Sequence, residues 1–294
     1  MTLIVGYANE EIGFLVGETL LTPLLEVKGN PIGPVSGEFH GLKIQIIDDN
    51  TAVAFASSNA ADAALTLIGQ LAQELVQNAK FDPATRLAER HAELLASKKS
   101  DPPDCEFLVL RIDGDRKRLA HITDGVLKYV ERAYIGDPAQ YRRLLELKKP
   151  YVGPKQQTTV HLDGTTTIES IVNSAGLVEF VEIGLALQAL VEQRRGEGIG
   201  AIAGNIIRVV DARISRKLEY LQTHEASITQ AEGKAGYSLL ASNSGKRGVG
   251  IYYVAGKVGF VMIAGDTEPC RKLPAETMDE FKQFAKSQFD LNLC

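Results

Sequence analysis

The order of strand-like and helix-like segments is the feature that most constrains the fold of this chain. Its first 56 residues hold four short apolar segments, at residues 2–8, 12–16, 42–47 and 51–56. Short apolar runs bounded by turn residues predict strands, and the spacing of these four predicts two hairpins. The segment that joins them, residues 28–41, is rich in glycine and proline, which indicates a loop.

The hydrophobic period then changes. Apolar residues recur every three or four positions from Leu65 to Val76, and a second helical stripe follows Asp82-Pro83. Three more strands are predicted at residues 106–112, 118–122 and 126–133, with a helix at 138–149.

The second half of the chain is predicted in less detail. Residues 150–167 are polar and indicate an inserted loop or small hairpin, and residues 167–195 indicate a long helix. Short strands are expected at 206–210 and 217–221, and the polar residues 225–248 indicate a segment without regular structure. A last hairpin, at 250–254 and 258–263, and a helix at 275–289 complete an additional unit over residues 225–294.

Blocks of antiparallel strands that alternate with helix pairs predict an α+β fold. We expect a four-layer αββα sandwich, in which two antiparallel sheets stack face to face and helices flank both. No internal repeat or domain boundary stands out, so residues 1–294 are predicted to form one domain. The strands at 2–8 and 12–18 should be adjacent and central.

Composition narrows the function. The net charge of −5 gives no basic excess with which to hold a polyanion, so we expect no nucleic-acid partner. Cys105, Cys270 and Cys294 lie far apart and form no C-x-x-C pair, which argues against disulfides and against zinc. The histidines show no metal-ligand spacing either, so we expect neither a metal nor a cofactor.

Nothing in the sequence indicates targeting or a membrane. The N-terminal segment lacks the Lys or Arg that opens a signal peptide. The longest apolar region, residues 176–191, carries Glu179 and Glu182 and is poorly suited to span a bilayer. We therefore expect a cytoplasmic protein with no membrane partner.

The residue that opens the first strand, Thr2, is a candidate nucleophile. A hydroxyl is a weak nucleophile and needs an adjacent base. If Met1 is removed, the α-amine of Thr2 is such a base, with an unperturbed pKa of about 7.7–8.0 that suits general-base work near neutral pH. Many proteins begin Met-Thr, so this dipeptide alone does not indicate catalysis.

The neighbourhood of Thr2 resembles the proteasome β-subunits and their bacterial relative, a two-ring threonine peptidase. The resemblance rests on Thr2-Leu3-Ile4-Val5, on Val16-Gly17-Glu18, on Lys43 at the start of a strand, and on the small residues 56–62. It covers about the first 80 residues, and residues 105–210 match in element order only. It implies the N-terminal-nucleophile hydrolase fold, cleavage of peptide or other amide bonds, and self-association into a homo-oligomer such as a ring.

The resemblance also assigns roles. Thr2 would be nucleophile and base, Lys43 would lower the pKa of its hydroxyl and amine, and Glu18 would keep Lys43 charged. Backbone N–H groups near Ser57 and Ser58 would receive the oxyanion. Asp137 and Glu197 stand at the positions of the supporting residues. An ordinary surface ion pair is the alternative explanation for Glu18 and Lys43.

Departures from the family pattern leave other functions open. The family has Asp in place of Glu18, and two of its supporting serines are missing, around Gly136-Asp137-Pro138 and Glu197-Gly198. A catalytically inactive assembly or binding subunit is therefore the alternative to a peptidase. A hydrolase of small, non-protein amides is a third hypothesis. Helix faces at residues 65–76 and 178–191 are the candidate subunit contacts.

Overall fold

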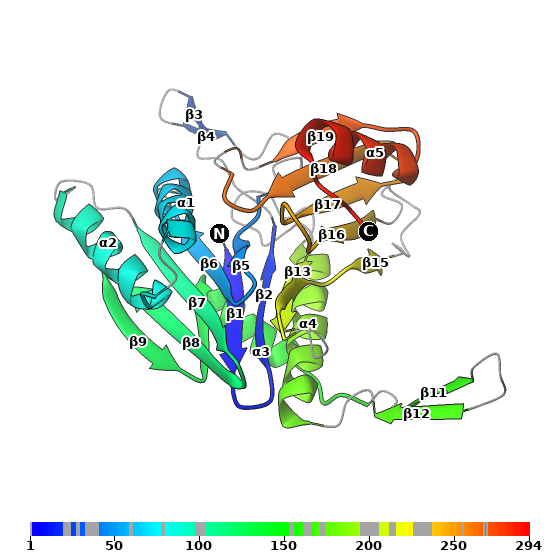
Figure 1. The fold of residues 1–294 in the computed structure, drawn as a ribbon, viewed down its shortest axis with the longest axis horizontal. Helices are drawn as coiled ribbons and strands as arrows, with labels where there is room; N and C mark the ends of the chain where they lie inside the picture. The colour runs from blue at the N-terminus through cyan, green and yellow to red at the C-terminus, as the bar shows by residue number, and fades with distance from the viewer. Residues whose placement is uncertain are drawn as a thin grey trace.

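The computed structural model describes most of the chain. The described residues are 2–19, 25–27, 30–32, 41–58, 61–77, 80–97, 104–152, 156–160, 166–170, 174–194, 206–211, 216–225, 237–254, 256–266, 268 and 270–294. Three five-stranded sheets form the body of this structure, and two small hairpins project from it (Figure 1).

The first sheet contains the N-terminal strand at its centre. Its strand order is β10-β1-β2-β13-β14, and the pairs are antiparallel. The strands are β1 (Leu3–Ala8), β2 (Gly13–Glu18), β10 (Arg132–Gly136), β13 (Ile206–Asp211) and β14 (Leu218–Tyr220). As the sequence predicts, the first two strands are adjacent and central.

The second sheet is an antiparallel meander of consecutive strands. Its members are β5 (Ile44–Asp48), β6 (Thr51–Ser57), β7 (Cys105–Asp113), β8 (Arg116–Thr123) and β9 (Val126–Val130). Two of the turns between its strands contain a glycine with a positive φ, 62° at Gly114 and 72° at Gly125, which glycine adopts more readily than other residues. A side chain at Gly125 would also meet the backbone of Ala92 in a helix above it.

The third sheet comes entirely from the C-terminal part of the chain. Its members are β15 (Thr223–Glu225), β16 (Tyr237–Ser242), β17 (Gly248–Tyr253), β18 (Val258–Ile263) and β19 (Arg271–Pro274). Two further hairpins pair β3 (Leu25–Val27) with β4 (Asn30–Ile32) and β11 (Gln156–Val160) with β12 (Thr166–Ser170).

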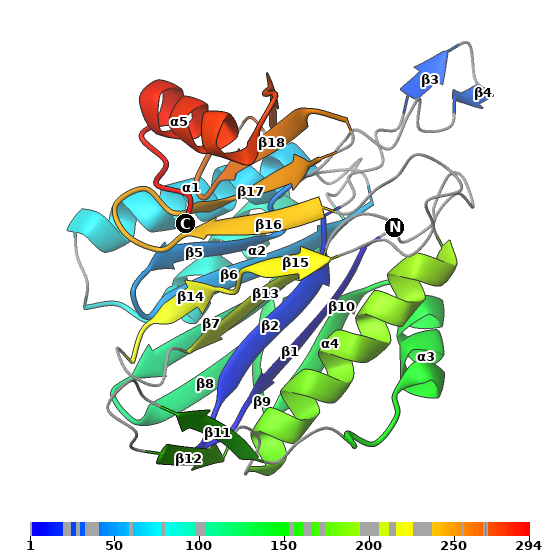
Figure 2. The same cartoon turned by 90° about the vertical axis from the view of Figure 1, so that its right-hand side faces the viewer.

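Five described helices cover the outer faces of the sheets. They are α1 (Ala61–Gln77), α2 (Pro83–Ser97), α3 (Pro138–Leu147), α4 (Ala175–Arg194) and α5 (Met278–Phe289). α1 and α2 pack on the second sheet, α3 and α4 on the first, and α5 on the third. Figure 2 shows α4 lying along β1 and β2, with α5 above the third sheet. Among the described residues, no helix combines the length and apolar character that crossing a membrane requires.

One apolar core lies between the inner faces of all three sheets. Ile4 and Leu15 enter it from the first sheet and Leu108 from the second, while Leu239 and Ile251 enter it from the third. Alternate residues of β1 and β2 point the other way, toward α3 and α4, because side chains of a strand alternate between its faces.

The predicted four-layer αββα sandwich of two sheets is wrong. Helix pairs do cover the outer faces of the first two sheets, but the chain is mostly β, and a third five-stranded sheet packs on the same core. Residues 223–294 therefore supply a whole sheet and its helix, where the sequence predicts one hairpin and a helix over residues 225–294. The hairpin that was predicted is present as β17 and β18.

Three element boundaries also differ from the prediction. The single strand expected at residues 126–133 is two strands in different sheets, because the chain leaves β8 after β9 and joins β1 as β10. The helix expected from residue 167 begins at Ala175, and residues 166–170 form a strand. The strands β16 and β19 lie in stretches where no strand is predicted.

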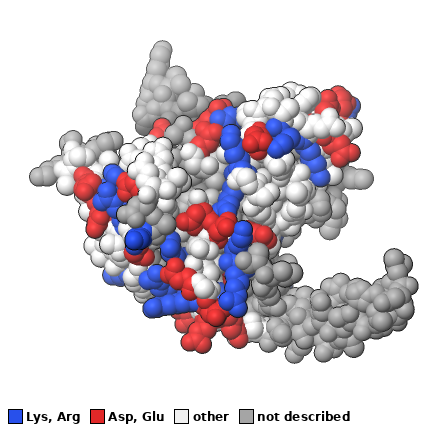
Figure 3. Space-filling view, viewed as in Figure 1, with Lys and Arg blue, Asp and Glu red and all other residues white. Residues whose placement is uncertain are grey.

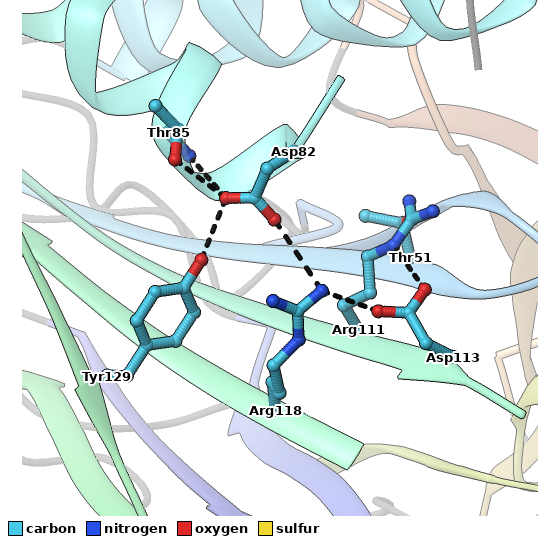
Figure 4. A network of polar contacts seen from close by, with 7 residues as sticks. All are labelled: Thr51, Asp82, Thr85, Arg111, Asp113, Arg118 and Tyr129. Carbon is cyan, nitrogen blue, oxygen red and sulfur yellow. Dashed lines mark hydrogen bonds and ion pairs between the residues drawn. The ribbon is translucent and has the colours of Figure 1, made fainter. Parts of the chain in front are cut away.

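A polar network fixes the start of α2 to the outer face of the second sheet (Figure 4). Asp82 accepts hydrogen bonds from the Thr85 backbone N–H at 3.0 Å and from Tyr129 Oη at 2.8 Å. Arg118 lies between two carboxylates, 3.9 Å from Asp82 and 2.5 Å from Asp113. These contacts join α2 to β8 and β9 at one end of the sheet.

Charged side chains of both signs are interleaved on the molecular surface (Figure 3). Lys217 lies 3.0 Å from Asp49, which also pairs with Arg247, and Arg216 lies 2.8 Å from Asp115. The face in view therefore carries no broad area of positive charge that would suit a polyanion.

Removing the Tyr220 hydroxyl should weaken the link between the first two sheets. In β14, this fully buried hydroxyl donates to the Ile44 carbonyl at 3.0 Å and accepts from the Ile46 N–H at 2.9 Å. Tyr220→Phe leaves that N–H buried without a partner, which costs about 1–3 kcal/mol of unfolding free energy. Urea unfolding measures the change. Tyr252→Phe, which removes one bond to a carbonyl, is the control and should cost less; equal costs would contradict the role of the link.

Acid should destabilise the protein through His91. This α2 side chain is buried beside Phe107, and neither ring nitrogen has a hydrogen-bond partner among the described residues. Burial lowers the pKa of His91, and the charge of Asp124 opposes this only in part. Below about pH 6.5 the unfolded chain takes up a proton that the folded chain refuses, so stability falls as the pH decreases.

The His91→Leu variant measures this contribution. Between pH 6.5 and 5.5 the wild-type protein should lose up to about 1 kcal/mol of unfolding free energy more than the variant does. The same pH slope in both proteins would show that His91 is not the group responsible.

Candidate functional site

The candidate site lies where the ends of the first two sheets meet. β1 begins there, β2 and β10 end there, and from the second sheet come the start of β5 and the end of β6. The Gly136 N–H, at the end of β10, donates a hydrogen bond of 3.0 Å to Oε2 of Glu106 at the start of β7. This contact shows that the two sheets end on the same side. The N-terminus is marked there in Figures 1 and 2.

Thr2 is largely buried and is held by its backbone. Its side chain faces the space between the sheets, because Ile4, two residues on, does so. The Thr2 carbonyl accepts a hydrogen bond of 2.8 Å from the Asp137 N–H. Gly136 has a φ of +97°, and a Cβ on it would lie 2.0 Å from the Thr2 carbonyl oxygen. Only glycine fits this corner, so the position of Thr2 depends on Gly136.

Glu18 and Lys43 form a buried ion pair beside the start of β1. Their side chains are 0% and 2% exposed. In the antiparallel register Ile4 faces Gly17, so the next residue of β2, Glu18, flanks the first residues of β1. Burial lowers the pKa of Lys43, and the charge and hydrogen bond of Glu18 oppose the decrease. A surface ion pair, the alternative explanation for these residues, does not describe this geometry.

Ser57 and Ser58 lie at the same end of the second sheet. The Phe55 N–H donates to the Lys43 carbonyl at 3.0 Å, and Ser57 follows two residues later at the end of β6. Ser57 Oγ accepts from the thiol of Cys105 at 3.6 Å, and burial raises the pKa of that thiol. Ser58 Oγ donates to Asp104 at 2.6 Å. The Ser57 and Ser58 side chains thus bond within their own sheet.

Asp137 has a structural role at the start of α3. It is the N-cap of α3, where its carboxylate accepts the N–H groups of Ala139 at 2.8 Å and Gln140 at 3.4 Å. Such a bond satisfies a helix N–H that would otherwise have no partner. The other predicted supporting residue, Glu197, lies outside the described residues.

Glu106 and His121 are site residues that the sequence analysis did not single out. Both face the space between the first two sheets, with side chains 32% and 23% exposed. His121 Nε2 lies 3.8 Å from Glu106 Oε1. Burial raises the pKa of Glu106, but the interaction with His121 and the hydrogen bond from the Gly136 N–H outweigh burial, and the pKa lies below its usual value. The sequence predicts the strand that contains Glu106, but it does not show that this side chain contacts a residue of the other sheet.

A small cavity is lined in part by Leu42, the residue that precedes Lys43. Its apolar walls are Leu42, Phe55, Leu65 and Ile263, with Gln45 among them and acidic residues at one edge. Those acidic residues, Asp266 and Glu268, pair with Arg271 at 2.6 and 3.1 Å. The cavity joins β5 and α1 to the third sheet.

Within the described ranges, no group of three or more His, Cys, Asp or Glu residues is arranged to hold a metal ion.

Comparison with known proteins gives a weak similarity. No family model matches the chain. UvrABC system protein A of Staphylococcus aureus strain MRSA252 is 27% identical over 180 residues, which cover 58% of this chain and 19% of that protein. The same protein of strain Mu50 is 26% identical over 181 residues, with the same coverage. The chain thus spans about a fifth of the length of the curated relatives it matches.

The resemblance to proteasome β-subunits is contradicted by these comparisons. The matches name UvrABC system protein A, and nothing among them points to the proteasome family. The quoted motifs were short: a four-residue strand, one acidic residue and one lysine. Buried strands that end in a charged residue arise in many folds, so such motifs do not establish a family.

Breaking the buried ion pair should cost more than removing it. Lys43→Met leaves Glu18 charged in the core, and we expect a loss of about 3–5 kcal/mol of unfolding free energy. The double variant Glu18→Leu/Lys43→Met removes both charges and should recover most of that loss. Chemical unfolding of the two variants tests the expectation.

Lys257→Met is the matched control, since Lys257 pairs with Glu276 on the surface. This variant should unfold almost as the wild-type protein does. A double variant no more stable than Lys43→Met would show that the two charges do not compensate each other.

Proposed function

We propose that this chain is an amide hydrolase that uses the Thr2 hydroxyl as nucleophile once Met1 has been removed. The observation that carries the proposal is the buried Glu18–Lys43 pair, which flanks the first residues of β1. The proposed substrate class is a peptide or a small amide. The Thr2 hydroxyl would take up the acyl group of such a substrate as an ester.

The buried ion pair contributes little net stability to the fold, which favours a functional reason for its presence. Moving two charges out of water costs several kcal/mol for each ion, and apolar residues of similar size are often at least as stabilising. We propose that Lys43 acts on Thr2, because a cation lowers the pKa of a nearby hydroxyl and of a nearby amine and so favours their deprotonated, reactive forms. The charge and hydrogen bond of Glu18 oppose the decrease in the Lys43 pKa that burial causes.

The reaction needs no further group on the chain for its proton transfers. The Thr2 Oγ would attack the substrate carbonyl carbon while the α-amine takes its proton, and the amine then gives that proton to the departing nitrogen. Water would next cleave the resulting acyl ester and restore Thr2. Backbone N–H groups after β6, near Ser57 and Ser58, are the candidate donors to the oxyanion.

An inactive assembly or binding subunit is the second candidate. The observation that favours it is Asp137, whose carboxylate caps α3 and so is committed to the fold. For either candidate we propose self-association through α1 and α4, where Val76 is 88% and Leu185 is 56% exposed. Three free cysteines support a reducing, cytoplasmic location.

The similarity to UvrABC system protein A adds no activity to this proposal. The matched stretch is 19% of that protein, at 27% identity. The net charge of −5 and the interleaved surface charges also favour no nucleic-acid partner.

Changing Thr2 should abolish hydrolysis without unfolding the protein. Intact mass of protein from its native cell should show Thr2 as the first residue. Thr2→Val keeps the shape of this largely buried side chain but removes its hydroxyl, and we expect turnover of a fluorogenic peptide amide to decrease at least about a thousandfold. Thr2→Ser retains a hydroxyl and should retain measurable turnover.

An electrophile directed at N-terminal nucleophiles provides a second measurement. It should add one acyl group to Thr2 in the wild-type protein and none in Thr2→Val. Retention of Met1 in the native protein, together with no labelling, would refute the hydrolase and leave the binding subunit.

A further inference from the structure

We infer that Glu106, paired with His121, is a positioning residue for Thr2. The inference rests on the proposed function, since it concerns how the nucleophile is placed for attack. It rests on three contacts that link the first two sheets. The Asp137 N–H, next to Gly136, bonds the Thr2 carbonyl, the Gly136 N–H bonds the Glu106 carboxylate, and that carboxylate lies near His121.

The first contact fixes the backbone of Thr2. The Asp137 N–H holds the Thr2 carbonyl at 2.8 Å, and Gly136 lies so close that a Cβ would be 2.0 Å from the same oxygen. A movement of the Gly136 corner therefore moves Thr2. Displacement of a nucleophile by about 1 Å can reduce a rate a hundredfold.

The second contact fixes the Gly136 corner. Gly136 has a positive φ of +97° and is the last residue of β10, where the sheet ladder ends. Its N–H points out of the first sheet to Glu106 Oε2 at 3.0 Å. A hydrogen bond to an ionised acceptor is about twice as strong as one between neutral groups. Glu106 thus holds the corner from the second sheet.

The third contact holds Glu106. His121 lies on the neighbouring strand, two positions along from Glu106 in the cross-strand register, with its Nε2 3.8 Å from the other carboxylate oxygen. That separation is long for a hydrogen bond but allows an ion pair when His121 is protonated. A protonated His121 would therefore compete with the Gly136 N–H for the negative charge of Glu106.

Few other charges face this pair. From β9, Lys128 stands directly across from His121. From β10, the inward residues Ala133 and Ile135 are apolar. The α-amine of a processed Thr2 would be the remaining titratable group on β1.

Substitution of Glu106 separates positioning from charge. Glu106→Gln retains an oxygen that accepts the Gly136 N–H but cannot attract a protonated His121. Glu106→Ala removes the acceptor. We expect Glu106→Ala to lower kcat about tenfold to a hundredfold with less than about a twofold change in KM, because the substrate contacts are left in place. Glu106→Gln should keep kcat within about threefold of wild type at pH 8, because its amide oxygen still accepts the Gly136 N–H.

The pH profile distinguishes positioning from a structural role. As the pH falls from 8 to 6, kcat of the wild-type protein should decrease more than kcat of Glu106→Gln. His121→Gln should flatten the profile in the same way. Wild-type kcat in Glu106→Ala, or identical profiles in all the variants, would overturn the inference. Thermal unfolding identifies any variant that has lost its fold, in which case Glu106→Gln and His121→Gln carry the test.

A second readout does not depend on activity. Hydrogen exchange of the Gly136 amide should be slow in the wild-type protein and in Glu106→Gln, and faster in Glu106→Ala. If the wild-type protein neither turns over substrate nor is labelled at Thr2, the proposed function fails. Exchange then decides the positioning alone: unchanged protection of Gly136 in Glu106→Ala overturns it, and faster exchange supports it.

Discussion

The shared apolar core of the three sheets is the constraint on which the rest of the structure depends. Each sheet places one face in this core, so a polar group at its margin must find a partner inside the protein. Tyr220 meets this requirement with two backbone groups of β5, and Glu18 meets it with Lys43. Glu106 meets it with the Gly136 N–H. All three contacts join one sheet to another or one strand end to the next.

Local patterns predicted the first part of the fold well. The strands β1 and β2, the hairpin of β5 and β6, and the helices α1 and α2 follow from turn residues and hydrophobic period. The change of sheet between β9 and β10 could not be predicted, because the stretch is continuous in strand character and only packing moves it to β1. The third sheet was missed for another reason: polar residues before Tyr237 hide the short strand β16.

The site divides in the same way. Glu18 and Lys43 were expected as partners only through the resemblance to proteasome β-subunits; the ion pair is present although the comparisons contradict that resemblance. The sequence Asp137-Pro138 would have allowed the N-cap role of Asp137 to be predicted, since an acidic residue before a proline is a common helix start. The contact of Glu106 with Gly136 could not be predicted, because it depends on how two sheets stack, and no residue pattern along β7 records that.

Burial of Thr2 bears on its chemistry as well as on its packing. A free α-amine at this position would stand at the margin of the core, where desolvation disfavours the charged form and lowers its pKa. The positive charge of Lys43, held by Glu18 near the start of β1, acts in the same direction. From an unperturbed pKa of about 7.7–8.0, both effects leave more of the amine neutral at pH 7. In the proposed hydrolase, the packing that buries Thr2 would therefore also favour the form of the amine that accepts a proton.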